Sequence, residues 1–306
     1  MTRTRRERPN LQNLPTEQIL PGAQDLDRLS SLEIVQLINR EDATVAAAVH
    51  RALPQIARAI DVIAAGLRDG GRLIYVGAGT SGRLGALDAS EIPPTFNTDP
   101  RTVQFIMAGG PKALGASTEA SEDDTTVAEI KKRKPGKHDI VLGIATSGRT
   151  PFTIAAVEYA RRRSARTIAL TCNRDSPLER AADFAIVTEV GPEVLAGSSR
   201  MKAGTAHKMV LNMISTGAMC RLGYVYSNLM VNVWTKNEKL TQRAIRILEQ
   251  ATGAGHDAAS RALKAAGNHT PLAVVMLATG ASRSQARAAL KKSKGHVRQA
   301  IAIAKS

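Results

Sequence analysis

Aromatic residues are scarce in this chain of 306 residues, at 3% of the total, although apolar residues make up 43%. A core with so few rings is built from Ala, Val, Ile and Leu, which suits helices packed on a parallel sheet. Cysteine is also rare, because Cys172 and Cys220 are the only two and show neither metal-ligand spacing nor a disulfide framework. We therefore expect an α/β protein of a reducing compartment, without a bound metal.

Long apolar runs are missing as well. No stretch reaches the roughly 18 consecutive apolar residues that a membrane span requires, and the basic N-terminus is not followed by the apolar segment of a signal peptide. We expect a cytoplasmic protein without a membrane partner.

Acidic residues are too few to balance the basic ones, since 27 Asp and Glu stand against 42 Lys and Arg, for a net charge of +15. Such an excess raises the possibility of nucleic-acid binding. The basic groups are scattered, however, and aromatic residues do not alternate with them as a base-stacking surface requires. We expect mostly solvated charge and no specific nucleic-acid partner, with attraction of anionic substrates as the alternative.

Helix-like and strand-like patterns alternate along the chain. Residues 31–71 carry apolar residues at helical spacing and predict two or three helices. Short apolar runs that end in glycine or polar residues predict buried strands at 72–79, 103–110, 139–150, 166–173 and 184–191. The alternation predicts a doubly wound parallel sheet flanked by helices, with sites at the carboxyl ends of the strands.

The end of the chain differs in composition from this α/β region. Beyond Gly253 it is rich in Ala and falls into short helical stretches separated by glycines. We predict a flexible arm at residues 1–15, a ligand-binding catalytic domain with N-terminal helices at 16–250, and a small all-helical domain at 251–306.

Glycine and hydroxyl residues follow two of the predicted strands. The first loop, GAGTSGR, formally contains the dinucleotide fingerprint, but the next predicted strand ends in MAGG instead of the acidic residue that such a site requires. Backbone N–H groups at a helix start, together with hydroxyls, suit a phosphate better. The second loop, ATSGRTP, repeats this chemistry. The predicted phosphate-binding residues are Thr80, Ser81, Gly82, Ser147, Gly148 and Thr150. Ordinary turn chemistry is the alternative for either loop alone.

A third polar segment precedes the long helix that starts near residue 202. Ser198, Ser199 and Lys202 offer further donors to an anionic ligand. The alternative is an ordinary capped helix start with solvated basic residues.

Two glutamates are candidates for acid and base chemistry. Glu91 follows the first loop by about two helical turns and precedes two prolines, which restrict the backbone beyond it. Glu122 lies in the segment after the next strand. Its neighbours Glu119, Asp123 and Asp124 are rivals that the pattern alone does not separate.

Four long strings resemble the family of N-acetylmuramic acid 6-phosphate etherases, and the likeness covers nearly the whole chain. They are LIYVGAGTSGRLGALDASEIPPTF, GIATSGRTPF, GPEVLAGSSRMKAGTAHKMVLNMISTGAM and NLMVNVWTKNEKL. The resemblance implies a sugar-isomerase (SIS) fold, a homodimer with sites near the subunit interface, and a helical tail similar to a ubiquitin-associated domain. It also implies cleavage of the lactyl ether of a sugar phosphate, without a cofactor.

The resemblance assigns roles to the two glutamates. It implies that Glu91 donates a proton to the departing lactate and that Glu122 is a second acid/base. Two other functions remain open at this point. The SIS fold also occurs in sugar-phosphate-sensing regulatory proteins, and in isomerases that interconvert aldose and ketose phosphates.

Overall fold

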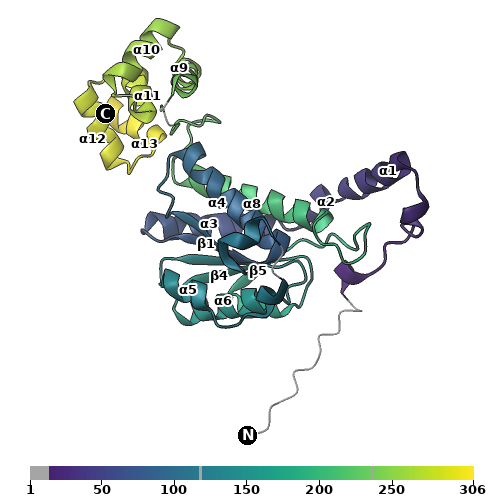
Figure 1. Ribbon diagram of the computed structural model, residues 1–306. Helices are drawn as coiled ribbons and strands as arrows, with labels where there is room; N and C mark the ends of the chain where they lie inside the picture. Colours follow the sequence, from purple (N-terminus) through teal and green to yellow (C-terminus); the bar gives the residue numbers. More distant parts are fainter. Residues whose placement is uncertain (1–13, 117–118, 234, 236) are drawn as a thin grey trace. The chain divides into compact units, whose positions relative to one another are not determined.

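The computed structural model describes residues 14–116, 119–233, 235 and 237–306, and these form two compact units (Figure 1). Among the described residues, the first unit contains those up to Ala59, then Leu73–Ala86 and Phe105–Leu211. The second contains Ile60–Arg72, Leu87–Gln104 and Asn212–Ser306. Most of the predicted N-terminal arm lies outside the described residues.

One five-stranded parallel sheet is present in the described part of the chain, in the order β2-β1-β3-β4-β5. The strands are β1 (Leu73–Gly77), β2 (Val103–Met107), β3 (Ile140–Ile144), β4 (Arg166–Thr171) and β5 (Phe184–Val187). After β1 the chain adds β2 on one side and then crosses to place β3 on the other. The predicted doubly wound parallel sheet is confirmed, and its strand order reverses between β1 and β3.

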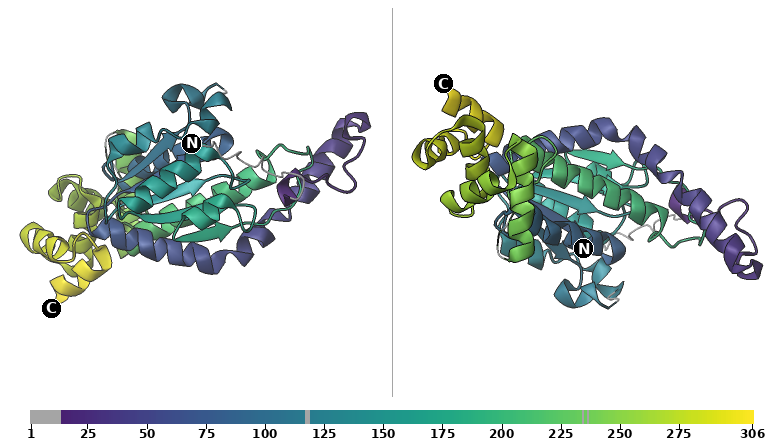
Figure 2. Two further views of the ribbon diagram at one scale, coloured as in Figure 1. Left: turned by 90° about the horizontal axis from the view of Figure 1, so that it is seen from below. Right: turned by 90° about the horizontal axis from the view of Figure 1, so that it is seen from above.

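Both faces of the sheet are covered by helices. On one face lie α5 (Ala128–Arg133), α6 (Pro151–Arg162) and α7 (Pro177–Ala181), and Figure 2 shows the helical layers beside the strands. Val76 and Val141 of the sheet share a buried cluster with Val157 of α6. On the other face α4 (Gly79–Phe96) approaches closely, because a Cβ atom at Gly85 would lie only 3.0 Å from the Cβ atom of Tyr75.

Three helices precede the sheet, where the sequence predicted two or three. They are α1 (Ser31–Asp42), α2 (Val45–Arg51) and α3 (Leu53–Arg68). A capping box starts α1, in which Ser30 accepts from the Glu33 N–H and the Glu33 side chain accepts from the Ser30 N–H. Pro54 does not break the segment because it lies in the first turn of α3, where an N–H has no partner within the helix.

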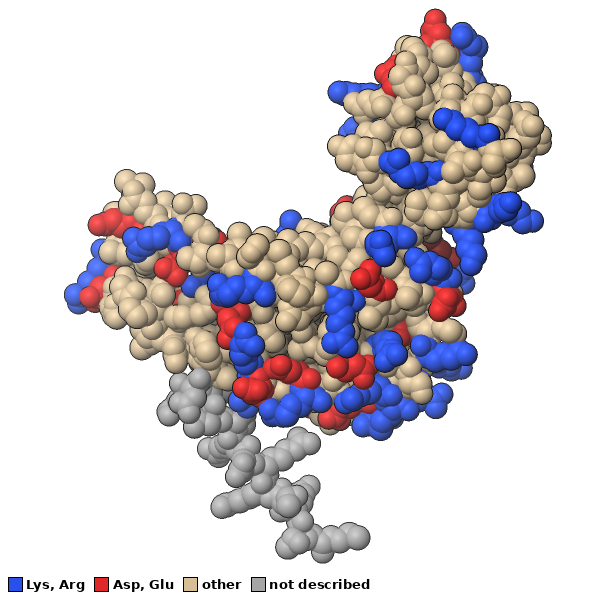
Figure 3. Space-filling view, turned by 180° about the vertical axis from the view of Figure 1, so that it is seen from behind, with Lys and Arg blue, Asp and Glu red and all other residues tan. Residues whose placement is uncertain are grey.

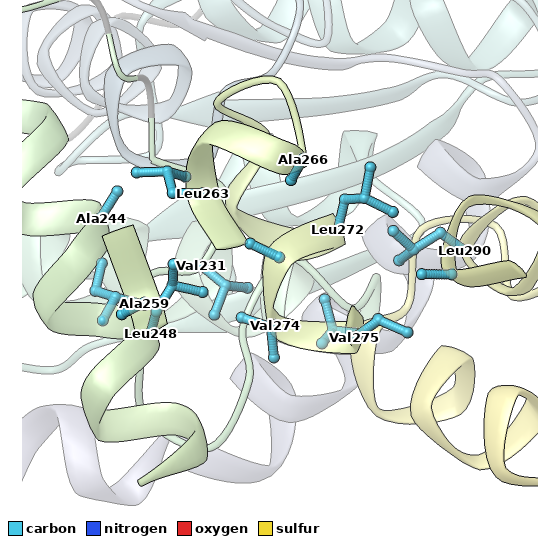
Figure 4. Close-up of a cluster of buried hydrophobic side chains, with 14 of the residues drawn as sticks. Val231, Ala244, Leu248, Ala259, Leu263, Ala266, Leu272, Val274, Val275 and Leu290 are labelled. Atoms are coloured by element: carbon cyan, nitrogen blue, oxygen red, sulfur yellow. The ribbon is translucent and has the colours of Figure 1, made fainter. Parts of the chain in front are cut away.

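The long helix α8 (Lys202–Arg221) leads into five shorter helices. These are α9 (Glu238–Thr252), α10 (His256–Ala265), α11 (Thr270–Thr279), α12 (Arg283–Lys292) and α13 (Val297–Lys305). Their buried apolar side chains form one cluster, which Figure 4 shows in close-up. The cluster also includes Ala244 and Leu248 of α9, which lie before the predicted start of the helical domain at residue 251. That domain boundary stays a prediction.

None of the helices in the described ranges combines the length and the apolar character needed to cross a membrane.

Candidate functional site at the ends of β1 and β3

The two hydroxyl-rich loops begin side by side. Gly77, the last residue of β1, pairs with Ile144, the last residue of β3. The strand order reverses between these two strands, and the crevice at such a reversal is where open α/β sheets bind ligands. The fold therefore places both predicted phosphate loops at its expected binding position.

The first loop is tight because the start of α4 packs directly on the end of β1. A Cβ atom at Gly82 would lie 2.7 Å from the carbonyl oxygen of Gly77, so both positions need glycine. Thr80 is half-buried and Ser81 is 8% exposed. Both lie in the first turn of α4, where the positive end of the helix dipole favours an anion.

The second loop turns at Gly148, which has a φ of +66°. A Cβ atom there would lie 2.9 Å from the Thr171 Oγ1 and would also collide with the side chain of Ser176. The Ser147 hydroxyl accepts from the Arg149 N–H at 3.2 Å and keeps its own proton to donate. Thr150 precedes α6 but makes no side-chain capping bond, so its hydroxyl can serve a ligand.

Asn173 is a residue of this edge that the sequence analysis missed. It lies in the loop after β4 and is buried. Its amide donates to the Thr146 carbonyl and to the Thr16 hydroxyl, each at 3.0 Å. The position of Asn173 at the end of a predicted strand could have identified it as a residue of this sheet edge. Asn173 fixes the second predicted phosphate loop against the loop after β4.

The segment after β2 is tied to α4 by one side chain. It contains two short 3-10 helices, Gly110–Leu114 and Glu119–Asp123. The guanidinium of Arg83 donates to three of its carbonyl oxygens, those of Ala113, Leu114 and Ala116, at 2.9 to 3.1 Å. Because Arg83 follows Gly82 directly, the segment that carries Glu122 is anchored next to the first predicted phosphate loop.

The carboxylate of Glu122 lies beside that loop. Its Oε1 atom is 3.3 Å from the position that a Cβ atom at Gly79 would occupy, and the residue is half-buried. Its rivals Asp123 and Asp124 are exposed. Asp124 accepts from the Thr126 N–H at 2.8 Å, which lowers the pKa of its carboxyl group. The geometry favours Glu122 over these two as the acid of the segment.

The lysine of the third predicted segment is already paired. The Lys202 ammonium lies 2.8 Å from the Glu41 carboxylate of α1, and the two side chains are 4% and 19% exposed. The buried Glu193 carboxylate accepts from the backbone N–H groups of Lys202 and Ala203 at 2.9 and 3.0 Å, while burial raises its pKa. Lys202 therefore has no free ammonium for a ligand in this state.

The start of α8 nevertheless lies next to the first predicted phosphate loop. A Cβ atom at Gly204 would be 3.7 Å from the Thr80 Cγ2 atom. Ser198 and Ser199, just before α8, are half-buried. They stay candidates for contacts with a ligand.

Glu91 lies farther along α4, in the second compact unit. The helix continues through Pro93 and Pro94, and the Glu91 side chain is exposed. One turn earlier, Leu87 is also exposed, at 52%. In the same unit the buried Asp88 accepts from Asn212 and Ser215 of α8, at 2.9 and 3.0 Å, and so fixes this half of α4.

No three His, Cys, Asp or Glu side chains within the described ranges gather closely enough to hold a metal ion.

Two family models match overlapping parts of the chain. The model of the glucokinase regulatory protein N-terminal SIS domain matches residues 55–161, and the general SIS domain model matches residues 119–216. Together they cover the sheet and the helices around it.

Full-length relatives give a more specific match. The chain is 57% identical over 270 residues to a protein of Symbiobacterium thermophilum named N-acetylmuramic acid 6-phosphate etherase, covering 87% of this chain and 89% of the relative. Proteins of the same name from Streptomyces avermitilis and Streptomyces coelicolor are each 51% identical. The first match covers 90% of both chains and the second 88% of both.

Proposed function

Since this chain belongs to the N-acetylmuramic acid 6-phosphate etherase family, we propose that its sheet-edge site cleaves the D-lactyl ether of N-acetylmuramic acid 6-phosphate. The products are N-acetylglucosamine 6-phosphate and D-lactate, so the enzyme is a carbon–oxygen lyase that acts on a cell-wall sugar. The observation that carries the proposal in this structure is the Glu122 carboxylate, held beside a loop suited to a phosphate.

The loops after β1 and β3 bind the 6-phosphate in this proposal. The first turn of α4 contributes its helix dipole and the hydroxyls of Thr80 and Ser81. Ser147 and Thr150 contribute hydroxyls from the second loop, and the backbone at Gly148 allows the close turn. Ser198 and Ser199 add donors from the segment before α8. A phosphate fixed in this way sets the distance to the reacting carbons.

The reaction is an elimination followed by an addition. In the open-chain sugar the hydrogen on C2 is acidic because C2 lies next to the C1 aldehyde. Glu122 removes this proton, and the electron pair forms a C2–C3 double bond as the bond from C3 to the ether oxygen breaks. Glu91 gives a proton to the departing lactate oxygen. Water then adds its hydroxyl to C3 and a proton to C2, and two carboxyl groups suffice for these transfers.

We also propose that the enzyme is a homodimer in which Glu91 serves the site of the partner. Glu91 follows Ser81 by ten residues, which is about 15 Å along an α-helix. The phosphate binds beyond the start of α4, and only six bonds of roughly 1.5 Å each separate its phosphorus from the ether oxygen. Glu91 is exposed near the exposed Leu87, as a residue covered by a second copy would be.

Two other functions share this fold but are supported less well. A sugar-phosphate sensor, which the first family model suggests, needs the phosphate loops but no acid beside them. An isomerase shares the C2 proton transfer but releases no lactate. Names shared by relatives over nearly their whole length favour the etherase.

The direct test incubates the purified chain with N-acetylmuramic acid 6-phosphate and measures D-lactate. We expect lactate and N-acetylglucosamine 6-phosphate in equal amounts. Binding of the substrate without lactate release would support the sensor instead. A change of the sugar without lactate release would support the isomerase.

A further inference from the structure

The second compact unit contains a pocket of about 600 Å³ that the proposed reaction does not use. Its walls come from the turn after α8, the turn that leads into α11, and α12 with the turn after it. The wall residues that matter here are His269, Leu272, Arg283, Arg287, Lys291 and Lys294. Pockets of this volume are typical of small-molecule sites.

The pocket wall is strongly basic. Arg283, Arg287, Lys291 and Lys294 recur at helical spacing along α12 and the turn after it. No Asp or Glu lines the pocket, and none of the four cations forms an ion pair with any described residue. Because the four charges are not neutralised and lie around a concave surface, they concentrate positive potential inside it.

The surrounding sequence adds to this charge instead of balancing it. From residue 256 to the end there are nine Lys and Arg but one Asp. In Figure 3 blue side chains outnumber red ones on the C-terminal helices, whereas blue and red are mixed over the rest of the face shown. Much of the net charge of the whole chain therefore belongs to this helical region.

The inner wall of the pocket is apolar. Leu272 and Leu290 line it and belong to the buried cluster of the C-terminal helices, as Figure 4 shows for both. Pro271 is also buried and lines the same wall. An inorganic anion would leave this wall uncovered, whereas a ligand with a ring or another apolar part would contact it.

His269 adds a neutral hydrogen-bond donor. Its Nδ1 atom accepts from the Leu272 N–H at 3.2 Å, which leaves the ring proton on Nε2. Burial and the nearby Arg287 charge lower the pKa of His269, so the ring is neutral near pH 7. The pocket thus combines several cations, the neutral donor of His269 and an apolar wall.

We propose that this pocket binds a small organic phosphate, with the phosphate held by Arg287 and Lys291 and the organic part on the wall of Leu272. Arginine and lysine pair with the several oxygens of a phosphate through charge-assisted hydrogen bonds. The site is separate from the loops after β1 and β3 and gives the helical region a ligand of its own. The proposal does not depend on the etherase reaction.

A matched set of probes tests the pocket in the full chain. 1-Naphthyl phosphate carries both a phosphate and an apolar ring, whereas 1-naphthol and inorganic phosphate each carry one. The variant R287A/K291A removes two cations from the pocket. The control R243A/R246A removes two exposed cations from α9, which does not line the pocket. Thermal unfolding of both variants shows that they are folded.

We expect 1-naphthyl phosphate to bind more tightly than either partial probe. R287A/K291A should weaken its binding about tenfold or more, and R243A/R246A by less than twofold. The sheet-edge site is the same in both variants, so phosphate bound there cannot produce this difference. Equal binding by the two variants overturns the proposal. A duplex oligonucleotide that binds more tightly than 1-naphthyl phosphate, and is lost with R287A/K291A, would instead identify a nucleic-acid surface.

Discussion

The ammonium of Lys202 and the carboxylate of Glu41 lie 2.8 Å apart, with both side chains largely withdrawn from water. Glu41→Gln would leave the Lys202 charge buried without its partner, and we expect a loss of about 3 kcal/mol of folding free energy. Urea unfolding measures it. The double variant E41L/K202M should recover most of the loss because apolar residues replace the pair.

The same double variant separates the two roles considered for Lys202. If Lys202 only holds α1 against the start of α8, E41L/K202M keeps a KM within about threefold of the parent. A KM raised far more in a protein of normal stability would show that the ammonium contacts the substrate.

Glu122→Gln should lower lactate release by roughly two orders of magnitude, because an amide cannot take the C2 proton. Asp123→Asn is the matched control, since its carboxylate is exposed in the same short helix. We expect that control to stay within twofold of the parent. A larger effect for Asp123→Asn than for Glu122→Gln would reverse the assignment.

Glu91→Gln should also lower lactate release by about two orders of magnitude while the substrate still binds. Mixing E91Q with E122Q after unfolding and refolding tests how the sites are built. If each site takes Glu91 from one subunit and Glu122 from the other, half of the dimers are mixed and carry one intact site. The mixture should recover about a quarter of the parent rate. No recovery, with mixed dimers shown to form, would mean that both acids act within one subunit.

Gly148→Ala should cost more stability than Gly110→Ala. Both glycines have positive φ, at +66° and +69°, so both variants incur the same backbone strain of roughly 1 kcal/mol. Only at Gly148 would the added carbon collide with Ser176 and Thr171. We expect the free energy of unfolding to fall by at least about 2 kcal/mol more in Gly148→Ala than in Gly110→Ala, and Gly148→Ala to bind substrate poorly. Similar losses in the two variants would contradict the tight packing of the second loop.

His207 predicts a loss of stability in acid. The ring is buried in α8, and burial lowers its pKa from 6.5 to about 4. Between these values the unfolded chain binds a proton that the folded chain does not, so stability falls as the pH drops. Below pH 4, His207 alone should lower the free energy of unfolding by about 3 kcal/mol relative to pH 7. Urea unfolding between pH 7 and pH 4 should show a weaker pH dependence for His207→Leu than for the parent.

Local patterns were enough to predict the five strands and the helices between them, because strand and helix periodicity depend on neighbouring residues. They also marked the glycine and hydroxyl loops, since these follow strands directly. Contacts between residues far apart in the sequence could not be predicted from local patterns. Lys202 looked available to a ligand because Glu41, its partner, lies 161 positions earlier. Glu122 could be preferred to Asp123 and Asp124 only once its carboxylate was placed beside Gly79.

The carboxylate of Glu193 makes the start of α8 different from the start of α4 as a place for an anion. At α8 the buried Glu193 carboxylate accepts from two backbone N–H groups of the first turn. At α4 the positive end of the helix dipole faces the predicted phosphate loop. We therefore expect the doubly charged phosphate of a substrate to bind at α4 and not at α8. Such binding would orient the sugar before either glutamate acts on it.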